Sequence, residues 1–270
     1  MRFYLFICLL LLAAGCFTPK EACLEIEAAN FDASADENCC CVYPKIGFTF
    51  SHVYDTLVFF EKTAYRNDFG MFRPHSVVFY LQNFQLRQQG AWYPITDTLS
   101  MASFGANAGD TTQQVLTNDF ILLRRTSLQT DAGTFRKTGT FDGIQFDLGL
   151  SDAANKVVPS KAPTAHPLRT QADNLWIDRN TGYVFARIIV ASDSLSSTVP
   201  DTFVYTVNTL PNTLFQQLGT NLDHATGYDF DLKLKIDYKQ LFNGVDWSAP
   251  LANRKVTMGD NLLNVFTVSQ

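Results

Sequence analysis

Hydrophobic and polar side chains alternate along several short segments of this chain. In Tyr228–Asp237 (YDFDLKLKID) every second residue from Phe230 to Ile236 is apolar, and Asp and Lys stand between them. Lys45–Phe50 (KIGFTF) shows the same period of two, which is typical of a strand with one buried face. Tyr183–Ala191 (YVFARIIVA) is almost continuously apolar and predicts a buried strand. The dominant local signal is therefore that of β-strands.

Weaker strand signals fill most of the remaining chain. They are Thr56–Phe60, Ser76–Leu86, Trp92–Ile95, Asp119–Arg124, Thr140–Leu148, Thr202–Thr209 and Asn264–Val268. Helical signals are short, at Leu210–Leu222 and Tyr238–Phe242, and no amphipathic helix of ordinary length is expected. Residues 101–114 are small and polar and residues 151–174 contain three prolines, so both are predicted to be loops. The pattern predicts an all-β protein, an antiparallel β-sandwich of immunoglobulin-like or related type with long loops.

The N-terminus has the pattern of an export signal. Arg2 precedes the apolar run Phe3–Leu12, and small residues then lead to Cys16. The run is too short to remain as a membrane-spanning helix, and small residues after it are typical of a cleavage site. The residues around Cys16 also resemble the bacterial lipobox, whose Cys is acylated and becomes the mature N-terminus. The expected division is a signal peptide at 1–15, a lipidated linker and cysteine-rich segment at 16–44, and a β domain at 45–270.

This division predicts an exported protein that is anchored through the lipid on Cys16 to a bacterial membrane, at the periplasmic face or the cell surface. No later segment approaches 18 consecutive apolar residues, so the lipid is the only membrane attachment expected. The net charge of −5 and the pI near 5.3 argue against a nucleic-acid partner, which requires a basic surface. The sequence does not indicate a protein partner.

No set of residues predicts catalysis. The serines of Ser192–Ser197 lack the glycines of a nucleophile elbow, and no glycine-rich loop is suited to cradling a phosphate. The acidic pair Asp229 and Asp231 falls on the solvent face of an alternating strand, where charge is expected. The 23 Phe and 10 Tyr are explained by packing in a β core. We therefore expect a protein that is not an enzyme.

Several short motifs occur in the order found in one known family. They are GFTFSH at Gly47–His52, FYLQNFQL at Phe79–Leu86, GIQFDLGL at Gly143–Leu150, GYVF at Gly182–Phe185 and LFNG at Leu241–Gly244. From about Lys45 to Phe266 the chain resembles the MbnP-like family, secreted or periplasmic proteins associated with copper binding. The resemblance implies a copper-binding module of the exported type found in Bacteroidetes.

The same resemblance implies a set of metal ligands. His52 stands where the family has a His in its opening strand, His166 lies in the long loop directly before Pro167-Leu168, and Trp176 precedes the Gly-Tyr of the next strand. Imidazole suits copper, and an oxidised tryptophan can supply a ligand in copper-binding relatives. The resemblance thus implies copper held by His52, His166 and Trp176 for delivery or sequestration. The other histidines, His75 and His224, are expected in turns or at the surface.

The chain departs from the family at several positions near that site. Asn155-Lys156 replaces an Asn-His, Gln217-Leu218-Gly219 replaces a His-Leu-Gly, and a single Trp176 replaces a Trp-x-Trp. These changes motivate an alternative reading, in which the protein is a cell-surface structural or adhesive module that has lost the metal site. Convergence of the three implied ligands would separate the two readings.

Four cysteines remain after the predicted lipidation site. They are Cys23, Cys39, Cys40 and Cys41. An even number in an oxidising compartment favours disulfides, and a soft-metal or redox role for the three consecutive cysteines is the alternative. The segment Cys23–Tyr43 resembles a cysteine-closed motif of exported Bacteroidetes-type proteins. That resemblance implies pairing of Cys23 with Cys41 and leaves Cys39 and Cys40 open.

Overall fold

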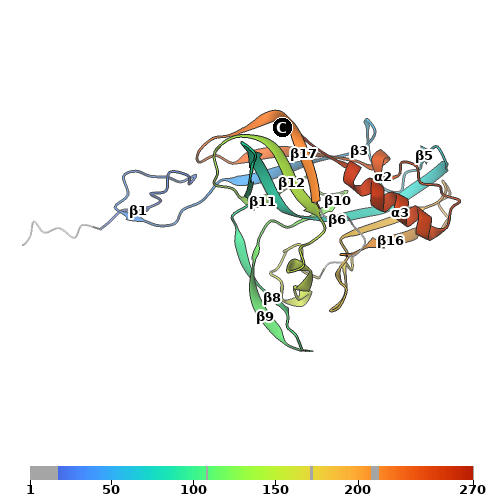
Figure 1. Ribbon diagram of the computed structural model, residues 1–270, viewed down its shortest axis with the longest axis horizontal. Helices are drawn as coiled ribbons and strands as arrows, with labels where there is room; N and C mark the ends of the chain where they lie inside the picture. Colours follow the sequence, from blue (N-terminus) through green and yellow to red (C-terminus); the bar gives the residue numbers. More distant parts are fainter. Residues whose placement is uncertain (1–17, 108, 171–172, 208–212, 270) are drawn as a thin grey trace, which may run out of the picture.

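The computed structural model describes residues 18–269 apart from 108, 171–172 and 208–212. Within them, two β-sheets form a sandwich, and the helices lie at the end of the molecule opposite the N-terminal strand β1 (Figure 1). The predicted all-β sandwich is therefore confirmed. The predicted signal peptide and the lipidation site at Cys16 lie outside the described residues. No helix in the described part of the chain is long and apolar enough to cross a membrane.

The larger sheet is built on β6 (Gly70–Gln88), a strand of 19 residues. Its length lets successive neighbours pair with successive parts of it: one strand pairs with Arg73–Phe79 and another with Leu81–Arg87. The sheet has the order β16-β15-β6-β12-β17, and three further strands pair with β6. These are β16 (Asp201–Tyr205), β15 (Ala186–Ala191), β12 (Gly139–Leu148), β17 (Thr213–His224), β5 (Tyr65–Asn67), β7 (Ala91–Pro94) and β10 (Ile121–Arg124).

The smaller sheet has the order β11-β3-β18-β19, with β4 paired to β3. Its neighbours are antiparallel except β3 and β18, which are parallel over eight residue pairs. This parallel pair is the one departure from the predicted antiparallel pattern among the strands of the two large sheets. The strands are β11 (Gln129–Thr134), β3 (Lys45–Tyr54), β18 (Phe230–Asp237), β19 (Phe266–Ser269) and β4 (Leu57–Val58).

Aromatic side chains fill the space between the sheets. Phe79 of β6 and Phe146 of β12 both meet the ring of Phe266 edge-on, with ring centroids 5.5 and 5.8 Å apart. Phe84 packs on Phe48 of the other sheet at 5.0 Å. Burying a side chain of this size stabilises the fold by roughly 1.5–3 kcal/mol relative to leaving it exposed. The apolar residues of the alternating sequence pattern are thus the ones that face inward from each strand.

The helices and the polar hairpin differ from the sequence prediction. The segment expected to contain a helical turn, 210–222, belongs from Thr213 to strand β17, because pairing with β12 outweighs local preference. α2 (Tyr238–Leu241) was predicted, whereas α3 (Leu251–Asn261) was not. α3 buries only three residues, Arg254, Met258 and Gly259, so it lacks the wide apolar face on which prediction relies.

The predicted loop 101–114 is also wrong, since it lies largely in a projecting hairpin of β8 (Thr98–Phe104) and β9 (Thr111–Thr117) (Figure 1). The hairpin packs on the long loop, where Val158 N donates to Ala102 O at 2.9 Å. That loop is irregular, as predicted, with single turns of 3₁₀ helix at η1 (Ala154–Lys156) and η2 (Pro159–Lys161). The remaining elements are β13 (Trp176–Asp178), β14 (Gly182–Tyr183) and η3 (Leu262–Asn264).

The residues before the sandwich form a small unit that we call the N-terminal segment, residues 18–43. It contains the parallel two-residue strands β1 (Glu21–Ala22) and β2 (Glu37–Asn38) and projects from one end of the molecule (Figure 1). A disulfide joins Cys23 to Cys41, the pairing that the resemblance implies. A second disulfide joins the adjacent residues Cys39 and Cys40.

Candidate functional site

His52 is buried on the inner face of β3, with 4% of its surface exposed. Its Nε2 lies 2.8 Å from the carbonyl oxygen of Ser127, so this nitrogen carries the proton and donates it. Its Nδ1 therefore accepts the hydroxyl of Tyr238 at 2.9 Å. Burial lowers the pKa of His52 and favours the neutral ring. Both ring nitrogens are thus used inside the protein, and neither offers a lone pair to a metal.

His166, in the long loop, also has both ring nitrogens in contact with other groups of the protein. Its Nδ1 accepts the backbone N–H of Leu168 at 3.1 Å, and its Nε2 lies 3.3 Å from Oδ1 of Asn118. Its ring meets Phe120 edge-on at 5.1 Å. Burial lowers the pKa of His166 to about 4, so the imidazole is neutral at pH 7. A metal could bind His166 only by displacing one of these contacts.

Trp176 is the first residue of β13 and pairs with Tyr183 of β14. Its ring stacks on Phe104 of the projecting hairpin, with centroids 5.9 Å apart. Its indole N–H is buried with no hydrogen-bond partner among the described residues, beside a cavity of about 60 Å³ whose walls include Tyr80, Arg169 and Tyr183. An intact indole is a donor only, so Trp176 as it stands has no lone pair for copper.

The three implied ligands therefore have separate surroundings. His52 contacts Ser127 and Tyr238, His166 contacts Asn118, Phe120 and Leu168, and Trp176 stacks on Phe104. The described residues contain no group of three His, Cys, Asp or Glu side chains that could hold a metal ion. As arranged here, His52 and His166 could each bind a copper ion only by giving up a hydrogen bond.

Of the two remaining histidines, His224 differs from the expectation of a turn or surface position. It is 3% exposed and lies between the carbonyl oxygens of Lys137 and Tyr228, at 2.7 and 2.9 Å. His75 is a half-buried residue of β6, and its Nε2 has no hydrogen-bond partner among the described residues. The position of His224 was mispredicted because local polarity does not reveal which strand face a partner will cover.

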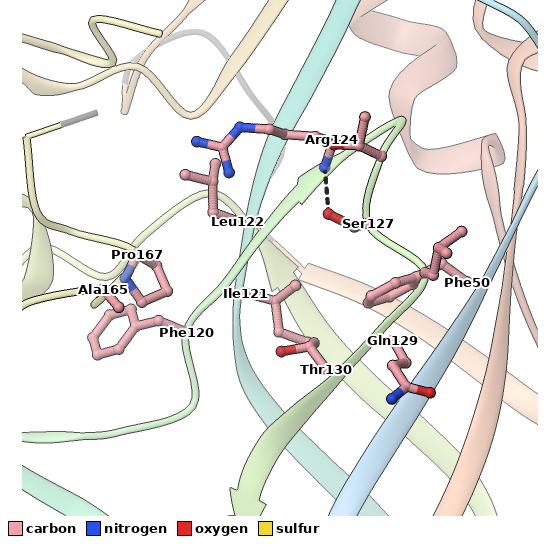
Figure 2. Close-up of a pocket in the computed structure, with 12 residues that line it drawn as sticks. Phe50, Phe120, Ile121, Leu122, Arg124, Ser127, Gln129, Thr130, Ala165 and Pro167 are labelled. Carbon is pink, nitrogen blue, oxygen red and sulfur yellow. Dashed lines mark hydrogen bonds between the residues drawn. The ribbon is translucent and has the colours of Figure 1, made fainter. Parts of the chain in front are cut away.

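One of the hollows near these residues is a groove between the two sheets (Figure 2). β10 belongs to the larger sheet and β11 to the smaller, and the two strands diverge from the turn that holds Ser127. The space between them has a volume of about 380 Å³. We call it the inter-sheet groove. Its lining residues are Phe50, Phe120, Ile121, Leu122, Arg124, Thr126, Ser127, Leu128, Gln129, Thr130, Ala165 and Pro167.

Two further hollows continue the groove. One, of about 530 Å³, shares Phe120 and Thr130 with it and is also lined by His166. The other, of about 480 Å³, shares Gln129 and Thr130 and is lined by three carboxylates and one lysine. Those charged residues are Asp131, Asp229, Asp231 and Lys45. The groove therefore leads from an apolar centre to an acidic end.

Both strands that border the groove have an unpaired edge. In the described part of the chain β10 pairs only with β6, and β11 is the terminal strand of its sheet and pairs only with β3. Ile121–Leu123 and Gln129–Asp131 consequently present backbone N–H and C=O groups without a second strand partner. An unpaired edge is a template for another extended chain. The sequence singled out the long loop that supplies Ala165 and Pro167, but not the divergence of the strands.

Fold and groove together define a β-sandwich module with an opening between its sheets and long loops on one side. A family model described as MbnP matches residues 43–258, and the chain therefore belongs to the MbnP family. Among solved structures it is similar to MbnP from Methylosinus trichosporium, with 13% identity and a TM-score of 0.45 over 82% of this chain and 96% of that one. No curated protein matches the chain.

Proposed function

We propose that this member of the MbnP family is an exported, lipid-anchored binding module that holds an extended peptide in the inter-sheet groove. The observation that carries the proposal is the pair of unpaired strand edges, Ile121–Leu123 and Gln129–Asp131, on either side of one groove. A peptide added to such an edge gains main-chain hydrogen bonds that do not depend on its sequence. This proposal agrees with the reading of the chain as a cell-surface adhesive module.

The lining supports selection of a particular kind of peptide. Phe50, Phe120 and Ile121 form an apolar centre that suits alternate side chains of an extended strand. At the acidic end Asp131 is paired with Lys45 at 3.1 Å, whereas the carboxylate of Asp231 has no cation partner in the described part of the chain. At the other end Arg124 is paired with Asp173 at 2.6 Å. After the pairing of Asp131 with Lys45 the acidic end of the groove keeps a net negative charge, which complements a basic residue of the ligand.

Filling the groove tests the proposal. Thr130 lines all three hollows with a half-buried side chain, so Thr130→Trp blocks the groove without removing a core residue. The probe is a short capped peptide of alternating Val and Thr with one terminal Lys, and binding is measured by calorimetry. We expect at least a roughly tenfold loss of affinity, since tenfold corresponds to about 1.4 kcal/mol. Thr63→Trp, at an exposed loop position, is the matched control.

A peptide with Glu in place of Lys separates charge recognition from strand addition. Its binding should be weaker at low salt and approach that of the Lys peptide as salt rises. Absence of binding by both peptides, or equal binding by the wild type and Thr130→Trp, would contradict the proposal.

Copper is the second candidate ligand. It is favoured by family membership and by two observations: His166 lines a hollow that continues the groove, and the Ser127 that His52 contacts lines the groove itself. Both imidazoles have lowered pKa values and are neutral, the form that binds metals. Each would have to exchange one hydrogen bond for the metal.

Metal analysis of protein produced in copper-supplemented medium tests this candidate. Stoichiometric copper that is lost in His166→Ala and retained in His75→Ala would support it, and no copper in the wild type would contradict it.

Export and anchoring are tested separately with Cys16→Ser, which should move the protein from the membrane fraction to the soluble exported fraction. Cytoplasmic retention of the wild type would contradict that part of the proposal.

A further inference from the structure

The two disulfides of the N-terminal segment differ in accessibility. Cys23 is fully buried, and its bond to Cys41 closes the segment. The second bond joins residues adjacent in the chain, of which Cys40 is exposed and Cys39 half-buried. Thiol–disulfide exchange requires an incoming thiolate to reach a sulfur atom. Only the Cys39–Cys40 bond presents an exposed cysteine to such an attack.

The two bonds also differ in the chain that they close. A disulfide stabilises partly by removing conformational freedom from the unfolded chain, and this contribution grows with loop length. The sequence separation is 18 for Cys23–Cys41 and 1 for Cys39–Cys40. The adjacent pair therefore gains the least from loop closure and should be reduced first.

The backbone at the adjacent pair is held by its neighbours. Cys40 has a φ of +56°, in the left-handed region that non-glycine residues rarely occupy. The side chain of Asn30 clamps this turn: its Nδ2 donates to the carbonyl of Cys40 and its Oδ1 accepts the N–H of Val42, both at 2.8 Å. Cys39 N donates to the carbonyl of Ala22 at 3.0 Å. Such unusual backbone conformations occur where a surrounding structure imposes them, often at functional sites.

We propose that Cys39–Cys40 is a redox-active site that accepts two electrons from a protein dithiol, while Cys23–Cys41 remains a structural bond. One thiolate of the dithiol attacks Sγ of Cys40, the Sγ–Sγ bond breaks, and Cys39 leaves as a thiolate that takes up a proton. The second thiolate of the dithiol then attacks the partner's first sulfur, which is bonded to Cys40 in the mixed disulfide. Cys40 is released and protonated, and the partner is left as a disulfide.

The charge of the segment specifies the partner. Residues 18–43 contain six acidic side chains and one lysine, and that lysine is paired with Asp32 at 2.6 Å. These acidic side chains attract a partner whose thiol is surrounded by positive charge.

Graded reduction of the intact protein tests the site. The protein is equilibrated with dithiothreitol over a wide range of concentrations, free thiols are alkylated, and peptides are assigned by mass spectrometry. Alkylation of Cys39 and Cys40 together, at a reductant concentration at least tenfold below that which opens Cys23–Cys41, supports the proposal. Simultaneous reduction, the reverse order, or a different pairing of the four cysteines overturns it.

Two variants and two thiols complete the test. The double variant Cys39→Ser/Cys40→Ser should keep the Cys23–Cys41 bond and lose the low-concentration step. Cationic cysteamine should reduce the wild type several-fold faster than anionic thioglycolate at low salt, and the difference should vanish at high salt. Equal rates at low salt would overturn the recognition of a basic partner.

Discussion

The N-terminal segment and the β-sandwich are held together by different interactions. The sandwich, with its loops and helices, buries more than a dozen aromatic rings, whereas the segment buries only Cys23 and Ala28 among its apolar residues. Apolar side chains that a core would cover, Ile26 and Val42 among them, are 66% and 56% exposed there. The segment has two-residue strands and is closed by the Cys23–Cys41 bond.

This contrast separates two kinds of chemistry. Where packing dominates, a polar group can have all its contacts inside the protein, as with His52 between Ser127 and Tyr238. Where packing is thin, reactive groups such as the Cys39–Cys40 pair remain accessible. The difference suggests that stability and redox chemistry can be altered independently.

The largest expected effect comes from emptying the aromatic core. Phe79 is fully buried and contacts Phe266 of the other sheet, so Phe79→Ala should lower the free energy of unfolding by about 3–5 kcal/mol. Denaturant titration measures the loss. Phe69→Ala, at a position 53% exposed, should change it by less than about 0.5 kcal/mol. Similar effects of the two substitutions would break the comparison.

The next effect is a pH dependence located in the sandwich. Asp119 is 1% exposed, its Oδ2 accepts the N–H of Phe84 at 2.9 Å, and burial raises its pKa to about 7 from 3.8. Because the folded pKa lies above the unfolded one, the contribution of Asp119 to stability is most favourable below pH 4 and declines as pH rises to about 7, by as much as about 4 kcal/mol.

Asp119→Asn should flatten this decline, which thermal unfolding between pH 4 and 8 will show. Asp32, in the N-terminal segment, is the control of opposite sign. Its hydrogen bond from Lys20 holds the pKa of its carboxyl below the usual range, so its contribution is present above pH 4 and is lost as pH falls. An unchanged slope in Asp119→Asn would contradict the assignment.

How much the sequence predicts depends on where the deciding contacts lie. The alternating strands β3 and β18 follow from their own residues, because each inward-facing position is apolar. α3 was not predictable, since its fit depends on Arg254, which binds Asp201 of β16 at 2.8 Å. β17 forms where a helical turn was expected because β12 provides its pairing partner.

The candidate site was less predictable than the fold. The family motif locates His52 on its strand, but its two partners lie 75 and 186 residues away in the sequence. The inter-sheet groove depends on β10 and β11 joining different sheets, which no local pattern encodes. The family resemblance correctly placed the fold, and the contacts of His52, His166 and Trp176 could come only from the structure.

Removing the structural disulfide should affect only the N-terminal segment. In the loop-entropy model a bond that closes 18 residues contributes about 3 kcal/mol, so the double variant Cys23→Ser/Cys41→Ser should open residues 18–43 to proteases. Hydrogen exchange should then show loss of protection in that segment alone. The unfolding midpoint of the sandwich should stay within error of the wild type, and a large drop would show that the two regions fold as one unit.

The smallest effect concerns the contact between the two regions. Arg136 of the sandwich lies over the ring of Tyr43, with its Cζ 3.3 Å from the ring centroid, and also pairs with Glu25 at 3.4 Å. Both charged side chains of that pair are about two-fifths exposed, so solvent screens the attraction. Arg136→Ala should therefore increase cleavage between segment and sandwich by only about two- to five-fold, in line with an exposed cation–π contact. Arg136→Lys keeps the charge but not the flat guanidinium, so its cleavage rate should lie between those of the wild type and Arg136→Ala. If Arg136→Ala instead unfolds the segment, this one contact, and not the Cys23–Cys41 bond, is what keeps it ordered.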